Sequence, residues 1–212
     1  MIMTTAVRKF ALTTHITASV GWLGSVAAFL ALAIAGLAAS ESEIVRAAYV
    51  GMHLTTWYVI VPLCGASLLT GFVEGVGTPW GLFRHYWVVT KLLLTVLATV
   101  ILLVHTQPID RVASAALQSA LASTDLRQLR IQLVGDASAA LFVLFVTTTL
   151  SVYKPWDMTP YGIRRQVEET NGHPPSSNRR ARPAGRYVLI AIVVFVATIV
   201  VLHLFGIGLH SH

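Results

Sequence analysis

The chain has 212 residues, of which 55% are hydrophobic and only 11% are charged. Soluble domains carry about 25% charged residues, so the composition excludes an ordinary soluble fold and indicates a protein of the lipid bilayer. The net charge of +6 does not indicate nucleic-acid binding, because the stretch 154–186, with seven basic and three acidic residues, supplies four of the six charges. A single cysteine, Cys64, excludes an intrachain disulfide and a cysteine-based zinc or iron–sulfur site.

Five apolar segments are long enough to cross about 30 Å of hydrocarbon at about 1.5 Å per residue of helix. In chain order they cover residues 10–38, 47–73, 85–105, 131–153 and 187–210. The first apolar stretch is much longer than the core of a signal peptide, which has about 7–15 residues, so we expect an uncleaved anchor. The sequence therefore predicts an all-α polytopic membrane protein.

The connecting segments divide the chain into three predicted parts. The segment NGHPPSSNRRARPAG (171–185) is rich in Pro, Ser and Arg, which predicts an extended or disordered connection. The region 110–130 alternates small apolar and polar residues and predicts an outer amphipathic helix that runs into the fourth span. We expect a four-helix membrane bundle at 1–155, a cytoplasmic Arg- and Pro-rich tether at 156–186, and a fifth membrane-spanning helix with a short tail at 187–212.

The basic residues outside the spans predict the orientation of the chain. If the N-terminus is cytoplasmic, ten of them lie on the inner side and four on the outer side. Because cytoplasmic loops carry the excess of Lys and Arg, we expect a multi-pass plasma-membrane protein with a cytoplasmic N-terminus and an external C-terminus. The expected partners are the lipid bilayer and either a membrane redox partner or a second copy of the chain, and no nucleic acid.

Ionisable side chains inside the predicted spans are the main functional signal, since such groups are costly in lipid and usually face the protein interior or an aqueous path. With the predicted orientation, His15 and Lys91 lie at a similar depth near the inner side. His53, His105 and His203 lie near the outer side on three different spans. Lys91 and His105 also share one helical stripe, so both are expected to point inward.

A matched pair of histidines at one depth on two helices can bind a b-type haem from both faces, because neutral imidazole is a good axial ligand for haem iron. The candidate cofactor-binding residues are His15, Lys91, His53 and His105, and the candidate metal ligands are His15, His53, His105 and His203. Two variants remain open: an outer haem between His53 and His105, and an inner site built on His15 with Lys91 near a porphyrin propionate. No catalytic residue is assigned, and whether the protein is an enzyme stays open.

Three stretches of the first half resemble a known group of membrane proteins. LTTHITASVGWLGSVAAF (12–29) has a histidine early in the first span, YVIVPLCGASLLTG (58–71) has a proline before a Leu-Thr-Gly ending, and YWVVTKLLL (86–94) has a lysine early in the third span. This combination is similar to the small integral membrane proteins grouped with the CopD-type copper-resistance proteins and the HemJ-type protoporphyrinogen oxidases. The resemblance covers residues 10–106.

In the HemJ-type group the early histidine and the lysine belong to the functional site, and a b-type haem is implied. His15 and Lys91 stand at the matching positions of this chain. The chain departs from the group after its first span, where it reads ALAIAGLAA (31–39) instead of an arginine followed by further polar residues. The resemblance therefore implies haem binding more directly than porphyrinogen oxidation.

Two other functions remain open from the sequence. Outer imidazoles, together with His210 and His212 in the tail, suit a copper-handling protein. A non-catalytic membrane subunit or scaffold would use none of the histidines for chemistry. His85, which precedes the aromatic pair Tyr86 and Trp87, is expected to be an interface residue rather than a ligand.

Overall fold

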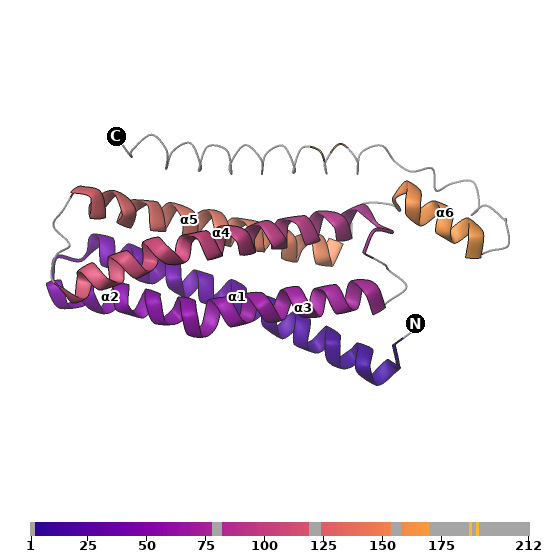
Figure 1. The fold of residues 1–212 in the computed structure, drawn as a ribbon, viewed down its shortest axis with the longest axis horizontal. Helices are drawn as coiled ribbons and strands as arrows, with labels where there is room; N and C mark the ends of the chain where they lie inside the picture. Colours follow the sequence, from indigo (N-terminus) through magenta and orange to yellow (C-terminus); the bar gives the residue numbers. More distant parts are fainter. Residues whose placement is uncertain are drawn as a thin grey trace. The chain divides into compact units, whose positions relative to one another are not determined.

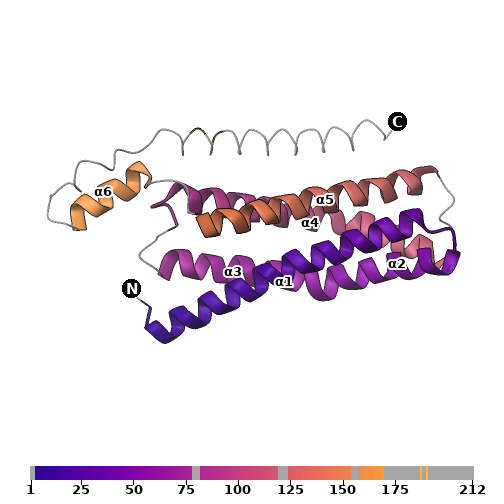
Figure 2. The same cartoon turned by 180° about the vertical axis from the view of Figure 1, so that it is seen from behind.

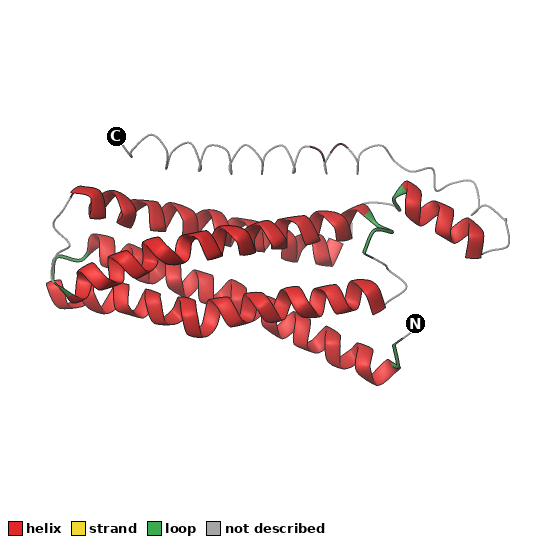
Figure 3. Cartoon of the chain, in the orientation of Figure 1, coloured by secondary structure: helices red, strands yellow, loops and turns green. Residues whose placement is uncertain are grey.

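The computed structural model describes residues 3–77, 82–118, 124–153 and 158–169, together with Tyr187 and Ile190. The described residues form helices and no strand, apart from one isolated bridge between His85 and Met158 (Figure 3). In chain order the elements are α1 (Thr5–Ala38), α2 (Ser42–Thr55), the π-helix η1 (Thr56–Ile60), α3 (Val61–Gly77), α4 (Tyr86–Leu117), α5 (Thr124–Tyr153) and α6 (Pro160–Glu169) (Figure 1). The predicted all-α class is confirmed.

Among the described residues, four helical stretches are long and apolar enough to cross a membrane, and they correspond to the first four predicted spans. They are Thr5–Ala38, Ser42–Gly77, Tyr86–Leu117 and Leu126–Tyr153. The predicted fifth span, 187–210, lies outside the described residues except for Tyr187 and Ile190. His203 and the connection 171–185 also lie outside them.

Helix α4 is longer than the span that the sequence predicts. The predicted end at His105 was wrong, because the helix continues through Pro108 to Leu117. A proline removes one helical hydrogen bond and crowds the preceding turn, but a long helix packed on its neighbours can continue past it. The predicted single helix over 110–130 was also wrong, since its first part ends α4 and its last part begins α5.

The chain divides into two compact units. The first unit comprises Met1–Pro79 and Leu93–Thr149, and the second comprises Trp80–Leu92 and Leu150–His212. In the second unit, α6 forms a helix inside the region 156–186 that the sequence assigns to the tether.

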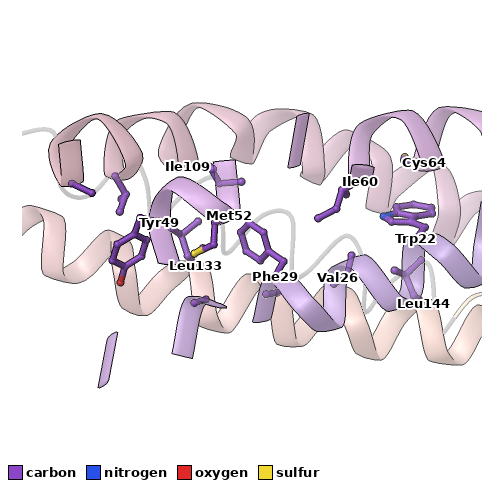
Figure 4. Packing of buried hydrophobic residues seen from close by; sticks show 14 of the residues in the cluster. Trp22, Val26, Phe29, Tyr49, Met52, Ile60, Cys64, Ile109, Leu133 and Leu144 are labelled. Atoms are coloured by element: carbon purple, nitrogen blue, oxygen red, sulfur yellow. The ribbon is translucent and has the colours of Figure 1, made fainter. Parts of the chain in front are cut away.

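In the first unit, α1 lies beside α2 and α3, as two opposite views show (Figures 1 and 2). The core is a continuous cluster of buried apolar side chains to which every spanning helix of the unit contributes (Figure 4). Its largest members include Trp22, Phe29, Tyr49, Met52, Ile109 and Leu133. Tyr49 and Met52 are almost completely buried, so α2 is fixed to this core through two consecutive turns.

The second span is interrupted by a π-helix just before Pro62. Pro62 has no backbone N–H and its ring crowds the preceding turn, so a regular α-helix cannot continue unchanged through it. The N–H of Val61 instead donates to the carbonyl of Thr56, five residues earlier. Such wide turns are rare and occur frequently at functional sites. Trp57 lies in this turn, four residues after His53.

Arg130 of α5 connects three helices of the first unit. Its Nε donates to the hydroxyl of Tyr49 at 2.7 Å, and its Nη2 donates to the carbonyl of Gly36 at 2.6 Å. The guanidinium also lies 5.3 Å from the centre of the Tyr49 ring, which favours a cation–π contact. Gly36 is required for this approach, because a Cβ atom there would lie 2.8 Å from Cζ of Tyr49.

We predict that Gly36→Ala lowers the free energy of unfolding by about 1–3 kcal/mol, because the added methyl group overpacks the contact with Tyr49. Gly24 is the matched control, since a Cβ atom at that position meets nothing within 4 Å. Gly24→Ala should be neutral or stabilising by up to about 1 kcal/mol, as expected from helix propensity. Equilibrium unfolding in detergent micelles measures both, and equal effects would contradict the close packing of Gly36 on Tyr49.

Candidate functional site

The first unit contains two histidine sites and one histidine–aspartate pair within its described spanning helices. The His53 site consists of His53, Trp57 and Asp110. The His15 site consists of His15, Ser67, Thr70 and Gly71. The pair consists of His105 and Asp136. All three are formed between different helices.

The His53 site joins α2, η1 and α4. The Nδ1 atom of His53 lies 2.9 Å from Oδ1 of Asp110, and the indole N–H of Trp57 donates to the same oxygen at 3.1 Å. The oxygen accepts from Trp57, and it also accepts from His53 when the hydrogen is on Nδ1. A neutral His53 ring then carries its lone pair on Nε2. The side chains of His53 and Asp110 are 38% and 42% exposed, so the site is half open.

An irregular turn in the second span and a continuous helix in the third position this site. His53 is in the last turn of α2, directly before η1, which contains Trp57. Asp110 follows Pro108, the proline inside α4. His53 is predicted from the sequence, whereas Asp110 is not, because the third predicted span ends at His105. A continued helical pattern across Pro108 was the signal that could have found it.

The surroundings of His105 differ from those of His53. Its side chain is buried, Nδ1 donates to the carbonyl of Ile101 at 2.7 Å, and Nε2 lies 2.9 Å from Oδ2 of Asp136. Both ring nitrogens are therefore engaged with oxygen atoms. Iron could bind His105 only after one of these contacts was broken, so His105 does not fit the role of a haem ligand. The structure gives His53 and His105 separate aspartates on different helices.

The His15 site joins α1 and α3. Nδ1 of His15, which is buried, lies 3.0 Å from the carbonyl of Ser67 and 3.1 Å from Oγ1 of Thr70. The Thr70 hydroxyl donates to the carbonyl of Ala66 at 2.6 Å, so its oxygen accepts from His15. The carbonyl of Ser67 also only accepts, which places the hydrogen on Nδ1. Gly71 makes room for the ring, because a Cβ atom there would lie 2.9 Å from Cε1 of His15.

Lys91 belongs to the second unit and is half-buried. Its predicted pairing with His15, a residue of the first unit, stays a prediction. His85 of the second unit pairs with Met158 in the isolated bridge, and its ring centre lies 6.2 Å from that of Trp87.

The described residues contain no group of three or more His, Cys, Asp or Glu side chains that could hold a metal ion. His210 and His212, like His203, lie outside the part of the chain that the structure describes. A haem needs fewer ligands from the protein, since one axial histidine suffices in several haem protein classes. His53 fits that role, because an oxygen acceptor at Nδ1 orients the ring and leaves Nε2 for the metal in the neutral form. The ring of His15 is likewise oriented by oxygen acceptors at Nδ1.

The chain is thus an all-α protein whose described part has four helices able to span a membrane, with histidines oriented by neighbouring helices. No family model, curated protein or solved structure matches it. The resemblance to the CopD-type and HemJ-type groups stays a prediction.

We predict that His105 and Asp136 are coupled more strongly than His53 and Asp110. The side chain of His105 is 8% exposed and that of Asp136 is 25% exposed, so solvent screens their interaction less than it screens the half-exposed pair. Double-mutant cycles with His→Gln and Asp→Asn variants should give about 1–2 kcal/mol for the first pair. The second pair should give less than about 1 kcal/mol. The reverse order would contradict the assignment of His105 to a structural contact.

Proposed function

We propose that this protein is an integral membrane redox protein that binds b-type haem, and that Nε2 of His53 would hold the iron. The observation that carries the proposal is the contact of Nδ1 with Asp110. A carboxylate at the second ring nitrogen fixes the orientation of a ligating histidine and makes it more basic. The bound haem would supply one-electron exchange between ferric and ferrous iron.

The other residues of the site support this role for His53. Trp57 donates to the same Asp110 oxygen, so the carboxylate is held in place while it orients the imidazole. The half-exposed ring can be approached from outside the packed core, whereas His105 is enclosed and engaged at both nitrogens. These contacts favour a site with His53 as ligand and His105 as a structural residue over the bis-histidine arrangement.

The His15 site is the second candidate for the haem. A backbone carbonyl and a hydroxyl orient His15 in the way that Asp110 orients His53. Neutral acceptors raise the basicity of the ring less than a carboxylate does, so a haem on His15 would have a higher reduction potential than one on His53.

We predict a reduced-minus-oxidised spectrum with a Soret shift and an α-band for protein purified from haem-replete cells. His53→Ala should remove the signal, and His15→Ala should leave it, because His53 is the proposed ligand. If His15→Ala removes the signal and His53→Ala leaves it, the haem is assigned to the His15 site. A wild-type spectrum without either band would overturn haem binding at both sites.

Metal analysis of the same preparation separates the other two functions. Stoichiometric copper without haem would favour copper handling. The preparation could also contain neither haem nor copper. If His53→Ala and His15→Ala then cause no phenotype, a non-catalytic membrane subunit is favoured.

We further predict that Asp110→Asn lowers haem affinity by about 10–100-fold, the usual cost of losing a carboxylate behind a ligating histidine. Asp136→Asn is the matched control, because Asp136 contacts His105 and not the ligand. Haem titration of the purified apoprotein measures both affinities. An equal effect of the two substitutions would show that Asp110 does not act on the ligand.

A further inference from the structure

Helix α6 of the second unit is fixed to the turn that precedes α4. The N–H of Thr159 donates to the carbonyl of Arg84 at 2.8 Å, and its hydroxyl donates to the carbonyl of Phe83 at 2.5 Å. The same hydroxyl oxygen accepts from the N–H of Gly162 at 3.1 Å and so caps the first turn of α6. Gly162 allows the close approach, because a Cβ atom there would collide with the carbonyl oxygen of Arg84.

This attachment places α6 at the boundary of a membrane-spanning stretch. The turn that holds it is directly followed by Tyr86, the first residue of the span Tyr86–Leu117. Aromatic side chains gather at such boundaries, where one part of the ring contacts lipid and another contacts water. Phe83 in the turn and Tyr161 on α6 are 59% and 51% exposed. Both side chains are therefore exposed beside the start of this span.

The exposed side of α6 is basic in its middle. Arg164 and Arg165 are exposed, and the guanidinium of Arg165 lies 5.9 Å from the centre of the Tyr161 ring. The acidic residues Glu168 and Glu169 stand at the C-terminal end of the helix, beyond the arginines. The two arginines and Tyr161 therefore form a basic, aromatic patch, which we name the α6 patch.

We propose that the α6 patch binds the headgroups of anionic phospholipids at the membrane surface. Arginine suits this partner, because its planar guanidinium can donate two hydrogen bonds to one phosphate group. Charge complementarity extends beyond the helix, since the sequence from 154 to 186 carries four more basic than acidic residues. Basic segments beside a spanning helix are attracted to anionic lipid in this way.

Hydrogen–deuterium exchange of the full-length protein tests the inference. The protein is placed in nanodiscs of phosphatidylcholine alone and in nanodiscs that also contain phosphatidylglycerol. We expect the amides of α6 to exchange at least several-fold more slowly in the anionic nanodiscs. Added salt should reduce the difference, because it screens charges at the surface. Equal exchange in the two lipids would overturn the proposal.

Substitution of both arginines by glutamine locates the effect. R164Q/R165Q should remove the dependence on lipid charge, a loss on the order of 10-fold in lipid preference. R111Q/R127Q is the matched control, since these arginines are exposed in the first unit, and it should keep the dependence. Similar exchange of R164Q/R165Q and wild type in phosphatidylcholine shows that α6 is still folded. A dependence that persists in R164Q/R165Q would overturn the role of the α6 patch.

Discussion

The constraint on which the first unit depends is that polar groups in spanning helices need partners inside the protein. Lipid offers no hydrogen bonds, and an unsatisfied polar group there costs several kcal/mol. Accordingly, His15 of α1 bonds to α3, His105 of α4 contacts Asp136 of α5, and Arg130 of α5 bonds to α1 and α2. Apolar packing alone would allow several rotations of these helices. The polar contacts select one of them, because any other would leave a charged or hydrogen-bonding side chain in lipid.

Irregular backbone gives the His53 site its geometry. In regular helices, the residues that face a neighbouring helix follow a fixed period, and a wide turn shifts that period for all residues after it. The π-helix before Pro62 shifts the register between His53 and α3, while Pro108 precedes Asp110 in the facing helix. The site therefore takes Trp57 from the irregular turn of the second span and Asp110 from a continuous α-helix.

The class of fold and the histidines could be predicted from the sequence, but the partners of the histidines could not. Run length alone identifies spans such as Thr5–Ala38, because about 20 apolar residues in succession match the thickness of the hydrocarbon layer. The end of α4 was missed, since a proline and an aspartate after His105 are typical of a loop. Partners such as Asp110 and Asp136 depend on how two distant helices are rotated and shifted. One sequence contains no direct signal of that rotation.

The contacts of the two ring nitrogens distinguish the histidines that can bind iron, whereas their membrane depth and helical stripe do not. The sequence predicts a similar membrane depth for His53 and His105, and the helical stripe predicts that His105 points inward. On these grounds both histidines were equal candidates for ligands. The structure shows two oxygen contacts on the His105 ring, one to a carbonyl of its own helix and one to the Asp136 carboxylate of α5, which links the two helices. All three histidines have an oxygen acceptor at Nδ1, and a neutral ring then carries its lone pair on Nε2. Ligation requires that lone pair, and at His105 it faces the Asp136 carboxylate, so this contact, and not the depth in the membrane, separates His105 from His53.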